Sequence, residues 1–294
     1  MSKVSRSIGV LGRAGEWHWA DLTRAATNRC SLVRCQFENL VAKVNAHSAT
    51  VYSGSICLNE LCGVILRAMP RGSLEEIIFR MDAVATLERA GICVVNSAKT
   101  CETCIDKFAA LVQLQSAGLS VPRTIVCQTK EAALAAFIEL SEDVVLKPVF
   151  GSEGRGLLRL RSVELADRLF QTMSQQGQTI YLQEYIDHAN WDLRLLVVDG
   201  DVYAIKRHNE LDWRLNATRG ASVTAVQANP EELRWARLVA EIVNARFCGV
   251  DLIYDQNDQP YILEVNASPG WRYVSQACGV DIAARVLDLI LSSR

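Results

Sequence analysis

The sequence predicts a mixed α/β protein, and two alternating patterns in its N-terminal third lead to that prediction. Short apolar runs that end in glycine, such as residues 7–12, have the length and composition of buried strands. The clearest helical pattern follows Ser73, with Glu75 and Glu76 in its first turn and Gly91 just past its end. Alternating strands and helices make residues 1–96 a small layered α/β domain.

The same alternation continues along the remaining two thirds of the chain. We expect helices over 104–117, 130–140, 163–175 and 231–246, and strands over 123–127, 144–149, 157–161 and 179–186. No internal repeat and no low-complexity linker interrupts the pattern. A chain of 294 residues is long enough for one to three packed domains.

The composition argues against several classes of partner. Half of the residues are apolar and the formal charge is −2, so no bulk attraction to nucleic acid or to a membrane is expected. No apolar run approaches the roughly 20 residues of a bilayer span, and the N-terminal segment lacks the apolar stretch of a signal peptide. Ten scattered cysteines indicate reduced thiols, and we expect a cytoplasmic protein.

Cys101 and Cys104 form a C-x-x-C pair. A zinc site would need a second pair or histidines at ligand spacing, and the sequence has neither. One interpretation is a redox pair. The other is two structural positions in the N-terminal turn of a helix.

The strongest chemical signal lies in an apolar hairpin near the C-terminus. Glu264 and Asn266 are two residues apart, so they share one face of a strand. If Tyr254 pairs with Tyr261, Asp251 faces Glu264 across the ladder at roughly 5 Å. Two carboxylates at that distance repel unless a cation lies between them, and carboxylate and amide oxygens suit Mg²⁺. The alternative is a solvated sheet face, which the apolar neighbours disfavour.

A glycine-rich loop over residues 150–156 follows a strand that contains Lys147. The loop lacks the Gly-Lys-Ser/Thr ending of a Walker A motif, and it lies between two strands, whereas a Rossmann fingerprint joins a strand to a helix. Its glycines allow backbone N–H groups to close on an anion. The pattern favours a flap that clamps phosphates together with Lys147. The alternative is a surface hairpin with Lys147 in solvent.

Further polar side chains in the same region outline a cationic cleft beside this hairpin. Each of them, taken singly, would be explained by a loop position or a surface ion pair. They are Gln183, Glu184, Asp192, Arg194, Lys206, Arg207, Arg214, Asn216 and Arg219.

An ordered set of motifs runs through roughly residues 97–280, namely S-A-K-T-C-E-T-C-I-D-K, V-V-L-K-P-V-F-G-S-E-G-R-G, Y-L-Q-E-Y-I, D-L-R, W-R-L-N-A-T-R-G, V-D-L-I-Y and L-E-V-N-A-S-P-G. This set resembles the ATP-grasp ligases, specifically the RimK-type α-L-glutamate ligases. F-G-S-E-G-R-G and N-A-S-P-G-W look most like the ligases that add glutamate to tetrahydromethanopterin or to the deazaflavin coenzyme. The resemblance implies an ATP-grasp fold of the α/β (α+β) class with a Rossmann-like pre-ATP-grasp domain. The implied domains are 1–96, a central lobe with the flap over 97–186, and a C-terminal lobe with the metal site over 187–294.

The resemblance also implies an ATP site. ATP would be bound by Lys107, Lys147, Gly151, Ser152, Gly154, Gln183, Glu184, Tyr185, Asp192, Arg214 and Asn216. Within this set, Glu184 and Tyr185 would hold the adenine edge and Asp192 the ribose. The transferred phosphoryl group would be stabilised by Lys147, Arg207 and Arg214, and Mg²⁺ (or Mn²⁺) would be held by Asp251, Glu264 and Asn266.

The implied reaction joins the amine of glutamate to a carboxylate of a small acceptor through an acyl phosphate. Such a reaction needs positioning and charge neutralisation rather than a Ser, Cys or His nucleophile. Candidates for substrate binding are Arg67, Arg71, Arg80, Arg194, Arg219, Trp271 and Arg272. Trp271 either stacks on a pterin or packs in the protein. We also expect a homo-oligomer, a dimer or a tetramer.

Two other functions stay open at this point. One is an ATP-grasp ligase for another acceptor, such as a peptide, an amino acid or a ribosomal protein tail. The other is a non-catalytic nucleotide-binding regulator, against which the intact set of Lys147, Asp251, Glu264 and Asn266 argues. ADP formation with a panel of carboxylates and amines would separate the three.

Overall fold

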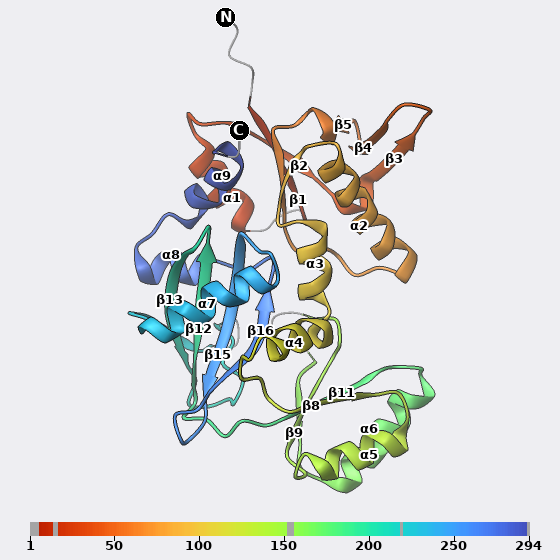
Figure 1. Ribbon diagram of the computed structural model, residues 1–294, viewed down its shortest axis with the longest axis vertical. Helices are drawn as coiled ribbons and strands as arrows, with labels where there is room; N and C mark the ends of the chain where they lie inside the picture. The colour runs from red at the N-terminus through yellow and green to blue at the C-terminus, as the bar shows by residue number, and fades with distance from the viewer. Residues whose placement is uncertain (1–5, 14–16, 152–155, 218–219, 293–294) are drawn as a thin grey trace, which may run out of the picture.

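Four parallel strands form the N-terminal sheet, in the order β2-β1-β6-β7. The computed structural model, which describes residues 6–13, 17–151, 156–217 and 220–292, places this sheet at one end of the molecule (Figure 1). Its elements are β1 (Ser7–Leu11), α1 (Trp17–Ala26), β2 (Ser31–Cys35), β6 (Gly63–Leu66), α2 (Leu74–Arg89) and β7 (Cys93–Val95). The predicted start of α2 is confirmed, because Ser73 and Glu76 each accept the other's backbone N–H in a capping box.

A small antiparallel sheet in the same third lies outside the elements predicted from sequence. Its strands are β3 (Leu40–Val44), β4 (Ala49–Ser53) and β5 (Ile56–Cys57), flanked by 3₁₀ turns at Phe37–Asn39 and Leu58–Glu60. The β3–β4 hairpin projects from the N-terminal end of the molecule (Figure 1).

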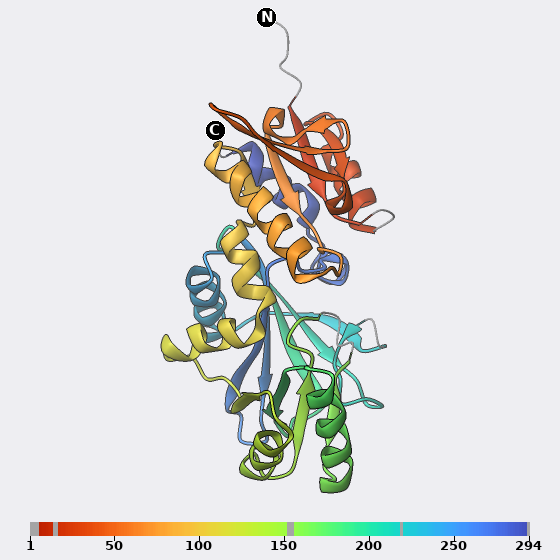
Figure 2. The same cartoon turned by 90° about the vertical axis from the view of Figure 1, so that its right-hand side faces the viewer.

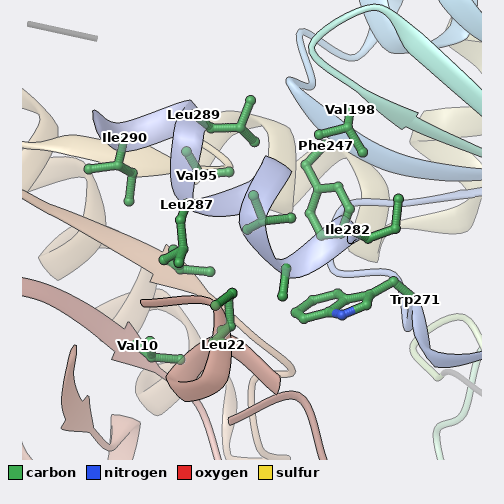
Figure 3. Close-up of a cluster of buried hydrophobic side chains, with 14 of the residues drawn as sticks. Val10, Leu22, Val95, Val198, Phe247, Trp271, Ile282, Leu287, Leu289 and Ile290 are labelled. Carbon is green, nitrogen blue, oxygen red and sulfur yellow. The ribbon is translucent and has the colours of Figure 1, made fainter. Parts of the chain in front are cut away.

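The last helix, α9 (Ile282–Leu291), returns to the N-terminal end and completes its core, where it packs against α1 and β7 (Figures 1 and 2). The preceding helix, α8 (Arg272–Cys278), packs instead against β13 (Asp201–His208) and β14 (Ser222–Val226) of the C-terminal sheet. Side chains from both ends of the chain share one buried cluster, which includes Val10, Leu22, Val95, Phe247, Trp271, Ile282 and Leu287 (Figure 3). The domain limits at residues 96 and 186 stay a prediction.

The helix expected over 104–117 is two helices, α3 (Ala98–Ile105) and α4 (Lys107–Ser116). The chain is extended at Asp106, whose carboxylate accepts from the backbone N–H groups of Phe108 and Ala109 and so begins the second helix. Lys107 is therefore the first residue of a helix rather than an interior one. No helix within the described ranges is long and apolar enough to cross a bilayer.

The central sheet is antiparallel, in the order β10-β9-β11-β8, and helices α5 and α6 lie side by side on it (Figure 1). Its elements are β8 (Thr124–Cys127), α5 (Lys130–Glu139), β9 (Val144–Lys147), β10 (Leu158–Leu160), α6 (Val163–Gln175) and β11 (Ile180–Glu184). Strands β9 and β10 pair directly, so the glycine-rich segment does join two strands as predicted.

The C-terminal sheet has five antiparallel strands, in the order β14-β13-β12-β15-β16. Its elements are β12 (Trp191–Val198), β13 (Asp201–His208), β14 (Ser222–Val226), α7 (Pro230–Ile242), β15 (Phe247–Tyr254) and β16 (Pro260–Asn266). One face buries Leu193, Leu195 and Val250 against α7 and α4. Because side chains alternate along a strand, Asp192, Arg194 and Asp251 lie on the opposite face.

A bulge sets the register of the metal hairpin. Tyr254 pairs with Pro260, one residue from the predicted partner Tyr261, but the register shifts between Asp251 and Leu252. Asp251 therefore still lies directly opposite Glu264. The predicted end pairing was wrong, and the predicted carboxylate pair is confirmed because the extra residue falls between the two positions.

Candidate active site

One pocket between the central and C-terminal sheets gathers most of the predicted site residues. It encloses about 850 Å³, counting the space that is open to solvent at its mouth. Twelve predicted residues line it: Lys107, Lys147, Gly151, Gln183, Glu184, Tyr185, Asp192, Arg207, Arg214, Asn216, Asp251 and Glu264. The predicted Ser152, Gly154 and Arg219 lie outside the described residues.

An apolar bed at one end of the pocket was missed by sequence reasoning. Ile186, Leu215 and Ile253 form a buried cluster that also contacts Leu263, and all four line the pocket. Ile253 follows Asp251 by two residues, so strand alternation already puts it on the same face as that carboxylate. An apolar surface of this kind suits an apolar ring system.

Two aromatic rings stand beside this apolar bed. Tyr185 and Trp213 both line the pocket, and their ring centroids are 6.0 Å apart in an edge-on arrangement. The Arg159 guanidinium lies 3.2 Å from the centroid of the Tyr185 ring and is itself bound to both carboxylate oxygens of Asp143. Arg159 belongs to β10, so the strand that follows the glycine-rich loop fixes the orientation of the tyrosine.

Glu184, which was expected at the adenine edge, lines the pocket and is paired with Arg123. Its carboxylate accepts from both the backbone N–H and the Nε of Arg123, each at 2.7 Å. A side-chain contact to a ligand would compete with this ion pair.

Two lysines enter the pocket from the side of the glycine-rich loop. Lys147 is buried and its Nζ donates to Gln183 Oε1, and Lys107 Nζ donates to Gly151 O at 2.7 Å. Burial lowers the pKa of Lys147 to about 8, although the charge of Glu264 opposes the shift. Burial likewise lowers the pKa of Lys107. Two partly desolvated ammonium groups that lack a full countercharge favour an anionic ligand.

Arg207 and Asp192, which were expected to contact different parts of ATP, are bound to each other. Arg207 Nε and Nη2 reach the two carboxylate oxygens of Asp192 at 2.7 and 2.5 Å. Arg207 Nη2 is also 3.2 Å from Asp251 Oδ1, and Arg194 Nη1 donates to the same oxygen at 2.6 Å. Arg194 does not line the pocket, so the structure gives it a partner in Asp251 rather than a substrate.

The metal candidates form a compact group near Lys107 and Lys147. Asn266 Nδ2 donates to Glu264 Oε1 at 2.8 Å, and Asp251 lies opposite Glu264 in the ladder. Burial favours protonation of Asp251, but the charges of Arg194 and Arg207 outweigh it and hold the pKa of this carboxyl below its ordinary value. An ionised carboxylate, a second carboxylate and an amide oxygen fit a hard divalent cation.

The same group is too small to enclose a cation. No cluster of three His, Cys, Asp or Glu side chains that could hold a metal occurs in the described parts of the chain. A cation here would therefore depend on the Asn266 amide and on oxygens from a bound phosphate, as Mg²⁺ commonly does.

Arg214 reaches the pocket from the loop after β13. Its guanidinium is held by Asp212, with Nε–Oδ1 at 2.9 Å and Nη2–Oδ2 at 2.7 Å. Asn209 Oδ1 accepts from the backbone of Leu211 and Asp212 and so shapes this loop.

Those predicted substrate residues that the structure describes do not line the pocket; they are Arg67, Arg71, Arg80, Arg194, Trp271 and Arg272. Trp271 is fully buried and its indole N–H donates to Asp21, which supports the packing alternative over stacking on a pterin. Arg67 is also buried, lies over the Trp271 ring and donates to Pro269 O. Arg80 is buried and bound to Pro70 O and Glu76. Arg71 and Arg272 are exposed.

The cysteine pair is structural in its surroundings. Cys101 and Cys104 both lie in α3, and burial raises the pKa of each thiol, that of Cys104 to about 12. Neither therefore has the lowered thiol pKa of a reactive cysteine.

Comparisons with known proteins agree with this geometry. Residues 104–290 match the RimK-like ATP-grasp domain family. A tetrahydromethanopterin:alpha-L-glutamate ligase of Methanosarcina acetivorans is 29% identical over an alignment of 280 residues that covers 85% of this chain and 86% of the relative. A probable alpha-L-glutamate ligase of Maridesulfovibrio salexigens is 30% identical over 234 residues, 76% of this chain and 75% of the relative.

A solved structure shares the whole fold. The ATP-grasp ligase PsnB complexed with a minimal precursor, Mg and ADP has a TM-score of 0.75 at 21% identity, over 99% of this chain and 98% of that one. This similarity confirms the predicted fold class.

Proposed function

The chain belongs to the RimK-like ATP-grasp family and is an ATP-dependent ligase; from that premise we propose that it adds L-glutamate to a carboxylate of a small, pterin-type cofactor. One observation supports the proposal most directly. Lys107, Lys147 and Arg214 converge with Asp251 and Glu264 on a single pocket that has an apolar bed at its other end. The relative from Methanosarcina acetivorans, which is named for this type of reaction, supports the choice of acceptor.

ATP fits the pocket in one orientation. The adenine ring would lie on Ile186, Leu215 and Ile253, because these are the apolar lining residues, and the phosphates would lie among the lysines and Arg214. Burial lowers the pKa values of the two lysines, so a polyphosphate would supply the negative charge that stabilises their protonated forms.

The reaction has two steps with balanced atoms. A carboxylate oxygen of the acceptor attacks the γ-phosphorus, the bond to the β,γ-bridging oxygen breaks, and ADP leaves. The neutral amine of glutamate then attacks the acyl carbon, the bond from that carbon to the phosphate oxygen breaks, and inorganic phosphate leaves with the proton that the nitrogen loses as the amide forms. Both steps depend on positioned charges rather than on a covalent intermediate with the enzyme.

Lys147 and Arg214 would stabilise the phosphoryl oxygens during the first step, and the ion pair with Asp192 would hold Arg207 close to them. Asp251, Glu264 and Asn266 would hold Mg²⁺, which supplies charge neutralisation at the phosphates when bound. Tyr185, whose ring is held by the Arg159 guanidinium, would cover one side of the adenine ring.

Purified protein with ATP, Mg²⁺, L-glutamate and reduced pterin cofactors tests the proposal. We expect ADP release together with a mass increase of one glutamate residue in the acceptor. Lys147→Met should lower kcat/KM by about 10²–10³, whereas the matched control Lys130→Met, which removes a lysine paired with Asp167 on the outer helices, should leave it unchanged.

The other functions considered from the sequence give different results in the same experiment. ADP release only with a peptide, amino acid or protein tail would replace the pterin by that acceptor. ATP binding without ADP release for every acceptor would favour a regulator and refute the ligase proposal.

Location and assembly form part of the proposal. All ten cysteines lie among the described residues and none forms a disulfide, which supports a reducing, cytoplasmic environment. A homo-oligomer is supported by apolar side chains exposed on β3 and α2, among them Val44, Leu74 and Ile78.

A further inference from the structure

Asn96 is a buried side chain at the carboxyl end of β7 that joins two remote segments. It is 2% exposed. Its Nδ2 donates to Phe247 O and to Ala267 O, the latter at 2.6 Å. Its Oδ1 accepts from the backbone N–H groups of Arg246 and Phe247, both at 3.1 Å. A carboxamide offers two donors and two acceptor lone pairs, so all of its hydrogen-bonding capacity is used.

Both remote segments lead directly to the metal candidates. Phe247 is the first residue of β15, which contains Asp251, and Ala267 follows Asn266 at the end of β16. The ladder between the two strands ends at the pair Gly249–Asn266. The Asn96 amide bridges the carbonyls of the two strands just beyond that last pair, so it continues the ladder where the backbone no longer does.

No common substitute reproduces this bridge. Aspartate has the same shape but, when ionised, no donor for the two carbonyls. Serine is too short to reach both strands, and glutamine is one methylene longer in a closely packed interior.

A neighbouring residue provides a matched comparison. Thr100, fully buried in α3, donates from Oγ1 to Asn244 O at 2.7 Å, so it also ties the N-terminal end of the molecule to the segment before β15. In the described part of the chain, the hydrogen bonds of Thr100 reach Ser97 and Asn244, and none of them reaches Ala267 or β16. Loss of the Thr100 bond therefore weakens the same junction without touching the strand end that holds Asn266.

We propose that Asn96 is a positioning residue for the metal site: it sets the separation of β15 and β16 at their metal-bearing ends and so couples the N-terminal sheet to the cation. This inference rests on the proposed function, because it assigns a cation to Asp251, Glu264 and Asn266. Metal-site residues that act through the ligands alter metal affinity about 10- to 100-fold when removed.

The test measures Mn²⁺ binding by electron paramagnetic resonance, with saturating ATP and no acceptor, in the wild-type protein, Asn96→Ser, Asn96→Asp and Thr100→Val. We expect the dissociation constant of Mn²⁺ to rise at least about tenfold in both Asn96 variants and to change less than about twofold in Thr100→Val, even where the Tm values fall alike. Equal Mn²⁺ affinities in Asn96→Ser and the wild type would overturn the proposal. A wild-type protein that binds no Mn²⁺ with ATP would overturn the proposed function as well.

A wild-type measurement covers the case in which the Asn96 variants do not fold. Because coupling between two sites is reciprocal, Mn²⁺ with ATP should slow hydrogen exchange of the Arg246 and Phe247 amides, both of which donate to Asn96. Amides of the β3–β4 hairpin serve as the control and should not change. Unchanged exchange at residues 246 and 247 with full Mn²⁺ occupancy would contradict the coupling.

Discussion

Gly249→Ala adds a methyl group where the Arg194 guanidinium lies. A Cβ at position 249 would be 2.7 Å from both Cζ and Nε of Arg194 and 2.8 Å from its Nη2, whereas ordinary contacts begin at 3.4 Å. The guanidinium must therefore move by about 0.7 Å. Arg194 donates to Asp251 Oδ1 at 2.6 Å, and a shift of that size along this bond would lengthen it beyond the roughly 3.2 Å of a good hydrogen bond.

The loss of folding stability depends on which ion pairs Asp251 keeps. Breaking a buried ion pair outright costs about 3–5 kcal/mol, but Arg207 still lies 3.2 Å from the same oxygen. We therefore expect Gly249→Ala to lower the free energy of unfolding by about 2–4 kcal/mol, and the Tm by about 3–6 °C for a chain of this size. Differential scanning calorimetry measures the Tm, and ADP release should fall with it because Asp251 loses its fixed position.

A double-mutant cycle decides whether the collision is the cause. Gly249→Ala in an Arg194→Met background should cost much less than in the wild type, because the colliding guanidinium is gone. Gly270→Ala is the control, since its nearest neighbour would be His18 Nε2 at an ordinary 3.5 Å. An equal cost of Gly249→Ala in both backgrounds would refute the reasoning.

Three further predictions concern ligand binding. Burial lowers the pKa of Lys147 to about 8, so its positive charge is present below that pH, and the Kd for ATP measured by calorimetry should rise as the pH increases through 8; a flat profile would contradict this. In Lys147→Arg the Kd should rise less steeply, with Lys107 as the remaining lysine of the pocket whose pKa is lowered. Glu264→Gln should raise the Mg²⁺ concentration for half-maximal ADP release about 10- to 100-fold, with the ATP affinity in the absence of metal as its control. Arg272→Ala should raise the KM for glutamate or acceptor more than that for ATP, and an unchanged substrate profile would remove Arg272 from the substrate site.

The strand alternation predicted the acidic pair because both residues lie within regular strands. Asp251 and Glu264 are separated by a short hairpin, so their pairing depends only on local register. The bulge between these strands was not predicted, because a one-residue shift of strand register leaves no distinct pattern among apolar residues. The phosphate end of the pocket was accessible to sequence reasoning because charged side chains in apolar strands are unusual.

The apolar end and the ion pairs depend on tertiary structure. Arg207 and Asp192 are partners because β13 pairs with β12. No pattern in the sequence distinguishes two charged residues that form such a pair from two that do not. The substrate role considered for Arg67 assumed exposure, but Arg67 is buried over the ring of Trp271, which itself lies in a core that unites distant parts of the chain. Sequence periodicity predicts which face of an element is buried, but not which remote element covers it.

The position of α9 has a consequence for synthesis on the ribosome. Leu22 leaves the exit tunnel 260 residues (282 − 22) before Ile282, which packs in the same buried cluster. The parallel N-terminal sheet must therefore remain with part of its apolar surface uncovered until α9 has been translated. Proteolysis of ribosome-bound chains arrested before residue 282 should cleave this sheet readily, and protection should appear only once α9 has emerged.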